Sequence, residues 1–134
     1  MITSVSTIEV RYSETDMMGI VYHASYLPWL ELGRTNLLKE TGVSYSSIEQ
    51  SGFFLPVVEI QMKYRRPATY DDTITIKTTM KEKAFAKIRL DYELHKNNEL
   101  IATGYSIHAF TNKSGQPIKA PRQFTEAFNQ AFYG

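Results

Sequence analysis

The chain contains no cysteine, which excludes disulfide bonds, thiolate metal sites and cysteine nucleophiles. No apolar run approaches the roughly 20 residues that a membrane-spanning helix needs. The first residues have neither a basic start nor a long apolar core, so we expect no secretory signal and a cytoplasmic location. The net charge is only +1, which argues against a nucleic-acid-binding module that relies on many phosphate contacts.

The 134 residues are enough for one domain with a hydrophobic core, and we expect a single domain over 1–134. Aromatic residues are plentiful, with nine Tyr and seven Phe. The three histidines are scattered and have no close pair, so a metal site is not expected. His95 and His108 lie in strand-like runs, where a structural or surface role is the simpler interpretation.

A long amphipathic helix is predicted over residues 25–41. Its apolar face has helical spacing and comprises Tyr26, Trp29, Leu30, Gly33 and Leu37. We expect Ser25 to cap the helix at its N-terminus. Gly42 suits the left-handed conformation that commonly ends a helix. Two shorter helices are predicted over residues 44–52 and 121–132.

Five strands are predicted from alternating apolar and polar residues. Their ranges are 7–12, 57–64, 73–80, 86–94 and 100–111. Short turns join the last four, so these strands should be antiparallel neighbours. The sequence therefore predicts an α+β fold in which one long helix packs on a five-stranded sheet.

Small residues on the last strand offer a place for the helix to pack. Ala102, Gly104 and Ser106 share one face of that strand, and we expect Gly33 to bring the helix backbone close to them. One helix covers only part of one face of the sheet. The remaining faces and edges would be exposed in a monomer, so we expect at least a dimer.

Between the first strand and the long helix lies a turn that contains a single carboxylate, Asp16, followed by Gly19. The helix begins a few residues later. A carboxylate beside a helix N-terminus brings a base or nucleophile close to an electropositive pole. That combination suits attack on a polarised carbonyl.

Two segments of the chain carry a family resemblance. One lies before the helix and comprises Thr15, Asp16, Gly19, Ile20, Val21, Tyr22, His23 and Tyr26; the other ends the second strand and follows it, and comprises Lys63, Tyr64, Arg65, Arg66, Pro67, Ala68, Tyr70, Asp71 and Asp72. Together they resemble the hotdog-fold acyl-CoA thioesterases of the 4-hydroxybenzoyl-CoA thioesterase family. The resemblance extends over residues 5–125. It implies a sheet wrapped around a long central helix, homodimers or homotetramers with sites at the dimer interface, and no cofactor.

In this resemblance Asp16 matches the catalytic carboxylate, and His23 matches the position whose backbone N–H polarises the thioester carbonyl. Asp16 could attack directly or deprotonate water, and the sequence leaves both routes open. Free N–H groups near Tyr22, His23 and Ala24 would stabilise the oxyanion. Gly19 and Tyr22 are expected to contact the substrate.

Other candidate substrate-binding residues lie farther along the chain. Val57 and Val58 are candidates for the acyl pocket wall, and Glu59 could reach the pocket from a partner subunit. Coenzyme A carries several phosphates, so we expect a basic rim, with Lys83 and Lys119 as its candidates. Core packing and ordinary solvent exposure are competing interpretations for these positions.

The expected function is hydrolysis of acyl-CoA thioesters, with acyl-carrier-protein thioesters as a further substrate class. Two alternatives stay open. A hotdog dehydratase would use a histidine with an acidic partner, and its His-containing Pro-Gly signature is absent from the sequence. A non-catalytic or very slow acyl-CoA-binding module would keep the pocket without turnover.

Overall fold

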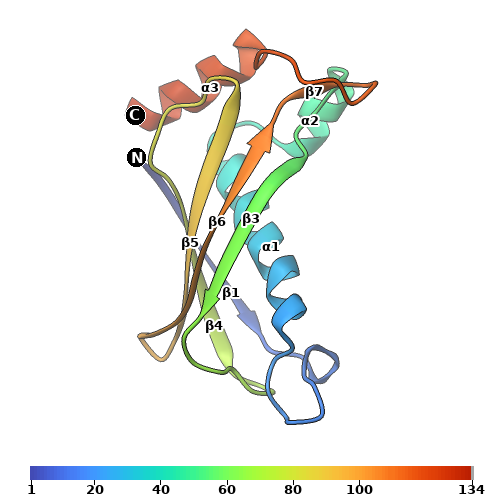
Figure 1. The fold of residues 1–134 in the computed structure, drawn as a ribbon. Coiled ribbons are helices and arrows are strands. Elements are labelled where there is room, and N and C mark those ends of the chain that lie inside the picture. The colour runs from blue at the N-terminus through green and yellow to red at the C-terminus, as the bar shows by residue number, and fades with distance from the viewer. Residues whose placement is uncertain (134) are drawn as a thin grey trace.

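Five strands form one antiparallel sheet in the order β1-β4-β5-β6-β3. They are β1 (Ile2–Glu9), β3 (Val57–Tyr64), β4 (Thr73–Met80), β5 (Lys87–Lys96) and β6 (Glu99–Ala109). The sheet curves around one long helix, α1 (Tyr26–Glu40), as Figure 1 shows. The structure is a computed structural model and describes residues 1–133. The predicted fold class is confirmed.

The apolar face predicted for α1 is the face that the sheet buries. Its contact with the sheet differs from the prediction, because Gly33 packs on β4 and not on the small residues of β6. A Cβ at Gly33 would collide with Thr78 Oγ1 and come within 3.0 Å of Ile76 Cγ2. Gly104 on β6 instead lies against the carbonyl oxygen of Gln61 on β3. The absence of a side chain at Gly104 therefore leaves room for the neighbouring strand and not for the helix.

The first strand covers residues 2–9 and not 7–12 as predicted. Ser4 and Ser6 point inward and are buried, which breaks the apolar alternation that the prediction relied on. Both serines hydrogen-bond to α1. Ser4 Oγ donates to Glu40 Oε1 at 3.0 Å, and Asn36 Nδ2 donates to Ser6 Oγ at 2.8 Å. The chain leaves the strand before Tyr12, which begins a short 3-10 turn, η1 (Tyr12–Glu14).

A short helix and a short two-stranded ladder lie near the C-terminal end of α1. Helix α2 (Tyr45–Gln50) matches the predicted helical connection, and Ser44 caps it by accepting a hydrogen bond from the Ser47 N–H. A two-residue ladder between β2 (Phe53–Phe54) and β7 (Thr111–Asn112) was not predicted. It is too short to produce a periodic pattern in the sequence.

The C-terminal helix α3 (Arg122–Tyr133) lies where a terminal helix was predicted. Phe124 and Phe128 are buried. The Phe124 ring stacks on Phe110, with 6.1 Å between the ring centroids. Within residues 1–133 no helix is both long and apolar enough to cross a membrane.

Strand β3 is an edge strand that pairs with β6 and not with β4, so the predicted neighbour pairing of strands 57–64 and 73–80 is wrong. The apolar side chains of β3 are unusually exposed, at 54% for Val58, 42% for Ile60 and 47% for Tyr64. An edge strand with open backbone groups and exposed apolar side chains is prone to pair with another chain. The structure therefore leaves this edge of the sheet uncovered.

Candidate active site

A cleft of about 450 Å³ opens at the end of the sheet where β1 and β3 finish, and we call this the cleft end. The residues that line it are Asp16, Ile20, Val21, Tyr22, His23, Tyr26, Tyr64, Arg65, Arg66 and Pro67. They come from the loop after β1, the start of the long helix and the segment after β3. Three of the predicted site residues, Asp16, Tyr22 and His23, thus lie around one cleft.

Asp16 is held in a tight turn. Its N–H donates to Ile20 O at 2.8 Å, and its carbonyl accepts from the Gly19 N–H at 3.0 Å. Gly19 has a φ of +80°, a conformation that glycine adopts without steric cost. Asp16 Oδ1 accepts from the Met18 N–H at 2.8 Å, and Oδ2 has no hydrogen-bond partner within residues 1–133. One carboxylate oxygen is therefore available at the cleft.

The helix begins earlier than predicted, with a 3-10 turn, η2 (His23–Ser25), that runs directly into α1. Ser25 is already helical, and its side chain makes no capping hydrogen bond. Tyr22 N–H donates to Glu14 O at 2.9 Å, so it is not free for a substrate. The first N–H groups of a helix have no intrahelical acceptor, which leaves those of His23 and Ala24 at the mouth of the cleft.

Tyr64, the last residue of β3, supports this helix start. Its hydroxyl donates to His23 O at 2.9 Å, and its ring lies 5.0 Å from that of Tyr26, centroid to centroid. Tyr64 is only partly exposed, and the partial burial of its phenol raises the pKa above its ordinary 10.0, so the hydroxyl stays protonated at neutral pH. In the sequence Tyr64 is only one residue of the second segment that carries the family resemblance, because the bond to His23 joins residues 41 positions apart.

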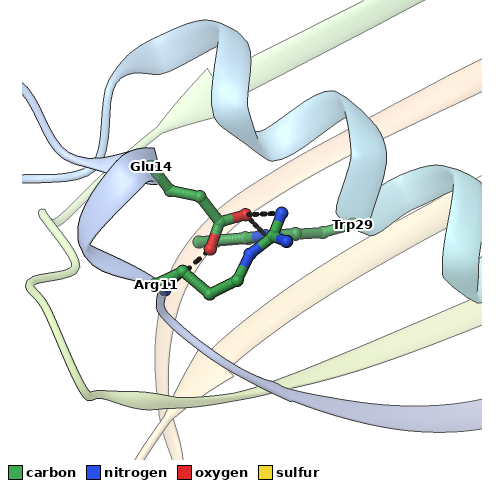
Figure 2. A network of polar contacts seen from close by, with 3 residues as sticks. All are labelled: Arg11, Glu14 and Trp29. Carbon is green, nitrogen blue, oxygen red and sulfur yellow. Dashed lines mark hydrogen bonds and ion pairs between the residues drawn. The ribbon is translucent and has the colours of Figure 1, made fainter.

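Glu14 is a buried carboxylate that no pattern in the sequence predicted (Figure 2). Its Oε2 accepts from Trp29 Nε1 at 2.7 Å and lies 3.5 Å from Arg11 Nη2, and its Oε1 accepts from the Arg11 N–H at 2.8 Å. Burial raises the pKa of Glu14, but the donors from Arg11 and Trp29 outweigh it and hold the pKa below its ordinary 4.5. Glu14 therefore joins the segment before Asp16 to the first turns of α1.

Four other candidate residues lie away from the cleft within one chain. Val57 and Val58 begin β3 and are exposed at its far end. Lys83 lies in the loop between β4 and β5, and Lys119 precedes α3, so both are also at the end opposite the cleft. Their predicted roles would require a second chain.

Glu59 lies on the face of the sheet that points away from α1. It accepts a hydrogen bond from Tyr105 Oη, and the Arg89 guanidinium lies 4.1 Å above the centroid of the Tyr105 ring. In a single chain the structure does not bring Glu59 to Asp16. Its proposed contribution to a pocket stays a prediction about a partner subunit.

His108 is fully buried and distant from the cleft. Its Nε2 lies 2.7 Å from Ser106 Oγ, which is 2.6 Å from Tyr92 Oη. Burial, together with the charge of Arg34, lowers the pKa of His108 to about 4. The imidazole is therefore neutral at pH 7 and acts as a structural residue. In the described part of the chain, no group of three His, Asp or Glu side chains could hold a metal ion.

Comparisons with known proteins place this architecture in a family. A family model described as the Thioesterase-like superfamily matches residues 10–128. A Bacillus subtilis protein provisionally named an acyl-CoA thioesterase, YneP, is 42% identical over 123 residues, which cover 90% of this chain and 86% of the relative.

Two solved structures are each 30% identical to the chain. DHNA-CoA thioesterase from Staphylococcus aureus has a TM-score of 0.91, covering 99% of this chain and 90% of the other. The hypothetical protein TT1821 from Thermus thermophilus has a TM-score of 0.90, covering 96% and 98%. The family resemblance is confirmed, and the chain belongs to the Thioesterase-like superfamily, with a hotdog fold.

Proposed function

We propose that this protein hydrolyses acyl-CoA thioesters to a free carboxylic acid and coenzyme A. The observation that supports this most directly is that Asp16, with one unpartnered carboxylate oxygen, lines the same cleft as the helix start at His23. The names of the relatives, acyl-CoA thioesterase and DHNA-CoA thioesterase, point to the same reaction.

In this mechanism the thioester oxygen is bound by the N–H groups of His23 and Ala24. Preorganised donors of this kind stabilise the developing oxyanion by roughly 3–4 kcal/mol each. Asp16 either deprotonates a water molecule that adds to the carbonyl carbon, or adds itself to form an anhydride that water then cleaves. In both routes the C–S bond breaks and the leaving thiolate of coenzyme A takes up a proton. The His23 side chain has no required role.

The active form would be a homodimer, or a homotetramer built from dimers. The exposed edge of β3 supports this proposal, since it presents open backbone groups and exposed apolar side chains at one edge. Antiparallel pairing of two β3 strands would bring the far end of one sheet toward the cleft end of the other. Val57, Val58, Glu59, Lys83 and Lys119 could then act on the partner's cleft.

Release of free thiol from a panel of acyl-CoA substrates tests the function. The panel should run from short aliphatic to long-chain and aromatic acyl groups and should include acyl-carrier-protein thioesters with the same acyl groups. We expect turnover of at least one CoA thioester well above that of an Asp16→Asn control. Absence of thiol release across the whole panel would contradict the proposal.

A non-catalytic acyl-CoA-binding module is the second candidate. It is favoured by one observation, which is that Asp16 Oδ1 already has a structural role as acceptor of the Met18 N–H. Such a module would bind acyl-CoA without releasing thiol, and Asp16→Asn would leave its binding affinity unchanged. Thiol release separates the two candidates, and calorimetric titration with a non-hydrolysable acyl-CoA thioether shows whether a protein that releases no thiol still binds acyl-CoA.

A further inference from the structure

Two arginines stand on the wall of the cleft at the end of β3, where no basic rim was expected. Arg65 and Arg66 both line the cleft. Their N–H groups donate to the same acceptor, Ile101 O on β6, at 2.8 and 3.1 Å. The backbone at both arginines is thereby fixed to the sheet. The segment between β3 and β4 contacts the loop between β1 and α1, where Ile20 and Thr69 form a β-bridge (Figure 1).

The two guanidinium groups differ in their partners. Arg66 Nε forms an ion pair with Glu99 at the start of β6. Arg65 forms no ion pair with any carboxylate of residues 1–133. Apart from Asp16, the lining of the cleft contains no acidic side chain. Arg65 is therefore an exposed cation that no carboxylate of residues 1–133 pairs with.

The surface continues beyond the cleft on the same side. A second hollow of about 240 Å³ shares Arg66 and Pro67 with the cleft. It also includes Lys96, whose Nζ lies 2.9 Å from Asp72 Oδ2. A ligand longer than the cleft can thus extend past the arginines without leaving the surface of the protein.

We propose that Arg65 binds the phosphates of coenzyme A and that the nucleotide leaves the cleft over Arg66 toward this second hollow. The inference rests on the proposed function. Coenzyme A joins an uncharged pantetheine arm to a polyanionic nucleotide, so a thioester held between Asp16 and His23 needs a cation at one side of the cleft. A guanidinium group is suited to that task because it donates in a planar fork that matches phosphate oxygens.

The earlier candidates Lys83 and Lys119 lie at the opposite end of the sheet. They could reach a phosphate only from a partner subunit. Arg65 lines the same cleft as Asp16 within one chain, so binding of phosphate by Arg65 does not require a partner subunit. The two arrangements make different predictions for single substitutions.

The test compares two substrates with the same acyl group, acyl-CoA and S-acyl-pantetheine, which lacks phosphate. In Arg65→Ala we expect the KM for acyl-CoA to rise about tenfold, as loss of one charge-assisted hydrogen bond predicts. The KM for acyl-pantetheine and the kcat for both substrates should stay at wild-type values. Arg65→Lys should recover part of the loss. Lys77→Ala, which removes an exposed cation from β4, is the control and should change neither KM.

The inference is overturned if Arg65→Ala leaves the KM for acyl-CoA unchanged, or raises both KM values equally. Calorimetric titration with free coenzyme A keeps the two proposals apart, because it does not depend on turnover. If the wild type binds coenzyme A about tenfold more tightly than Arg65→Ala but hydrolyses nothing, the proposed function fails and the role of Arg65 stands. If hydrolysis is normal and coenzyme A binds both proteins equally, only the role of Arg65 fails.

Discussion

Asp16 divides its carboxylate between two tasks. Oδ1 accepts the Met18 N–H and closes the turn, while Oδ2 has no partner within residues 1–133. An asparagine at this position could keep the first task, because its carbonyl oxygen can accept the same N–H. It could not act as a base or a carboxylate nucleophile. Catalysis and folding can therefore be separated at this residue.

Asp16→Asn is expected to lower kcat about a hundredfold or more, since general-base catalysis typically contributes that much. The circular dichroism spectrum, the thermal midpoint and the sedimentation coefficient should match the wild type. Stopped assays of thiol release provide the measurement. A variant that keeps most of its activity would remove Asp16 from the mechanism.

His23 is expected to act through its backbone. Its N–H is placed by η2, and its carbonyl oxygen is bound by the Tyr64 hydroxyl, so neither depends on the imidazole. In His23→Ala we predict a kcat close to that of the wild type. The substitution also removes the ring contact with Tyr22, and a change in KM alone would be consistent with that loss. A fall in kcat as large as that of Asp16→Asn would instead identify the imidazole as catalytic.

At the scale of elements, Glu14 connects η1 to α1. Its two oxygens accept from Arg11 and Trp29, and its carbonyl oxygen accepts the Tyr22 N–H. The turn that carries Asp16 lies between these two connections. Its position relative to the helix N-terminus therefore depends on a residue that does not line the cleft.

In Glu14→Gln one of the two oxygen acceptors is replaced by an amide group, which leaves a buried N–H unsatisfied. We expect a loss of about 1–3 kcal/mol in the free energy of unfolding, with a lower kcat and little change in KM. Trp29 is the only tryptophan in the chain, so its fluorescence reports directly on this contact. Glu126→Gln, which removes an exposed ion pair with Arg122, is the control and should have little effect.

For the whole molecule, His108 should make stability depend on pH. Its pKa is about 4 when folded, against an ordinary 6.5, so the unfolded chain binds the proton more tightly. Stability is then complete above pH 6.5 and falls as the pH drops toward 4. Between pH 7 and pH 5 we expect a loss of about 2 kcal/mol.

Urea denaturation at pH 7 and pH 5 measures this effect. His108→Gln should flatten the difference, because glutamine does not titrate and can still hydrogen-bond to Ser106. His95→Gln is the matched control and should leave the difference unchanged. An equal pH dependence in wild type and His108→Gln would assign it to other groups.

The assembly can be tested at the exposed edge of β3. Ile60→Lys places a charge on that edge, and we expect sedimentation velocity to show a single chain in place of the oligomer, with loss of thioesterase activity. Val5→Lys on β1, the other edge strand, is the control, because Val5 is also exposed, at 62%. A wild-type protein that sediments as one chain at micromolar concentration would contradict the dimer outright.

Periodic elements were predicted well because their signal is local. Strands β3 and β4 have the predicted bounds, and the apolar face of α1 is the buried one. The predicted bounds of the first strand were wrong because two of its buried positions, Ser4 and Ser6, are polar. Their hydroxyl groups form hydrogen bonds with the helix, and a search for alternating apolar residues does not detect them. The two-residue pairing of β2 with β7 was too short for any pattern to reveal.

The sequence by itself determined the fold class, the family resemblance and the candidacy of Asp16 and His23, because these depend on residue spacing over a few turns of chain. Only the tertiary structure decided what surrounds them. The bond from Tyr64 to His23, the burial of Glu14 against Trp29 and the place of Arg65 on the cleft all join segments that are distant in sequence. Such contacts arise from packing of the sheet around the helix, and the periodicity of residues within one segment cannot predict them.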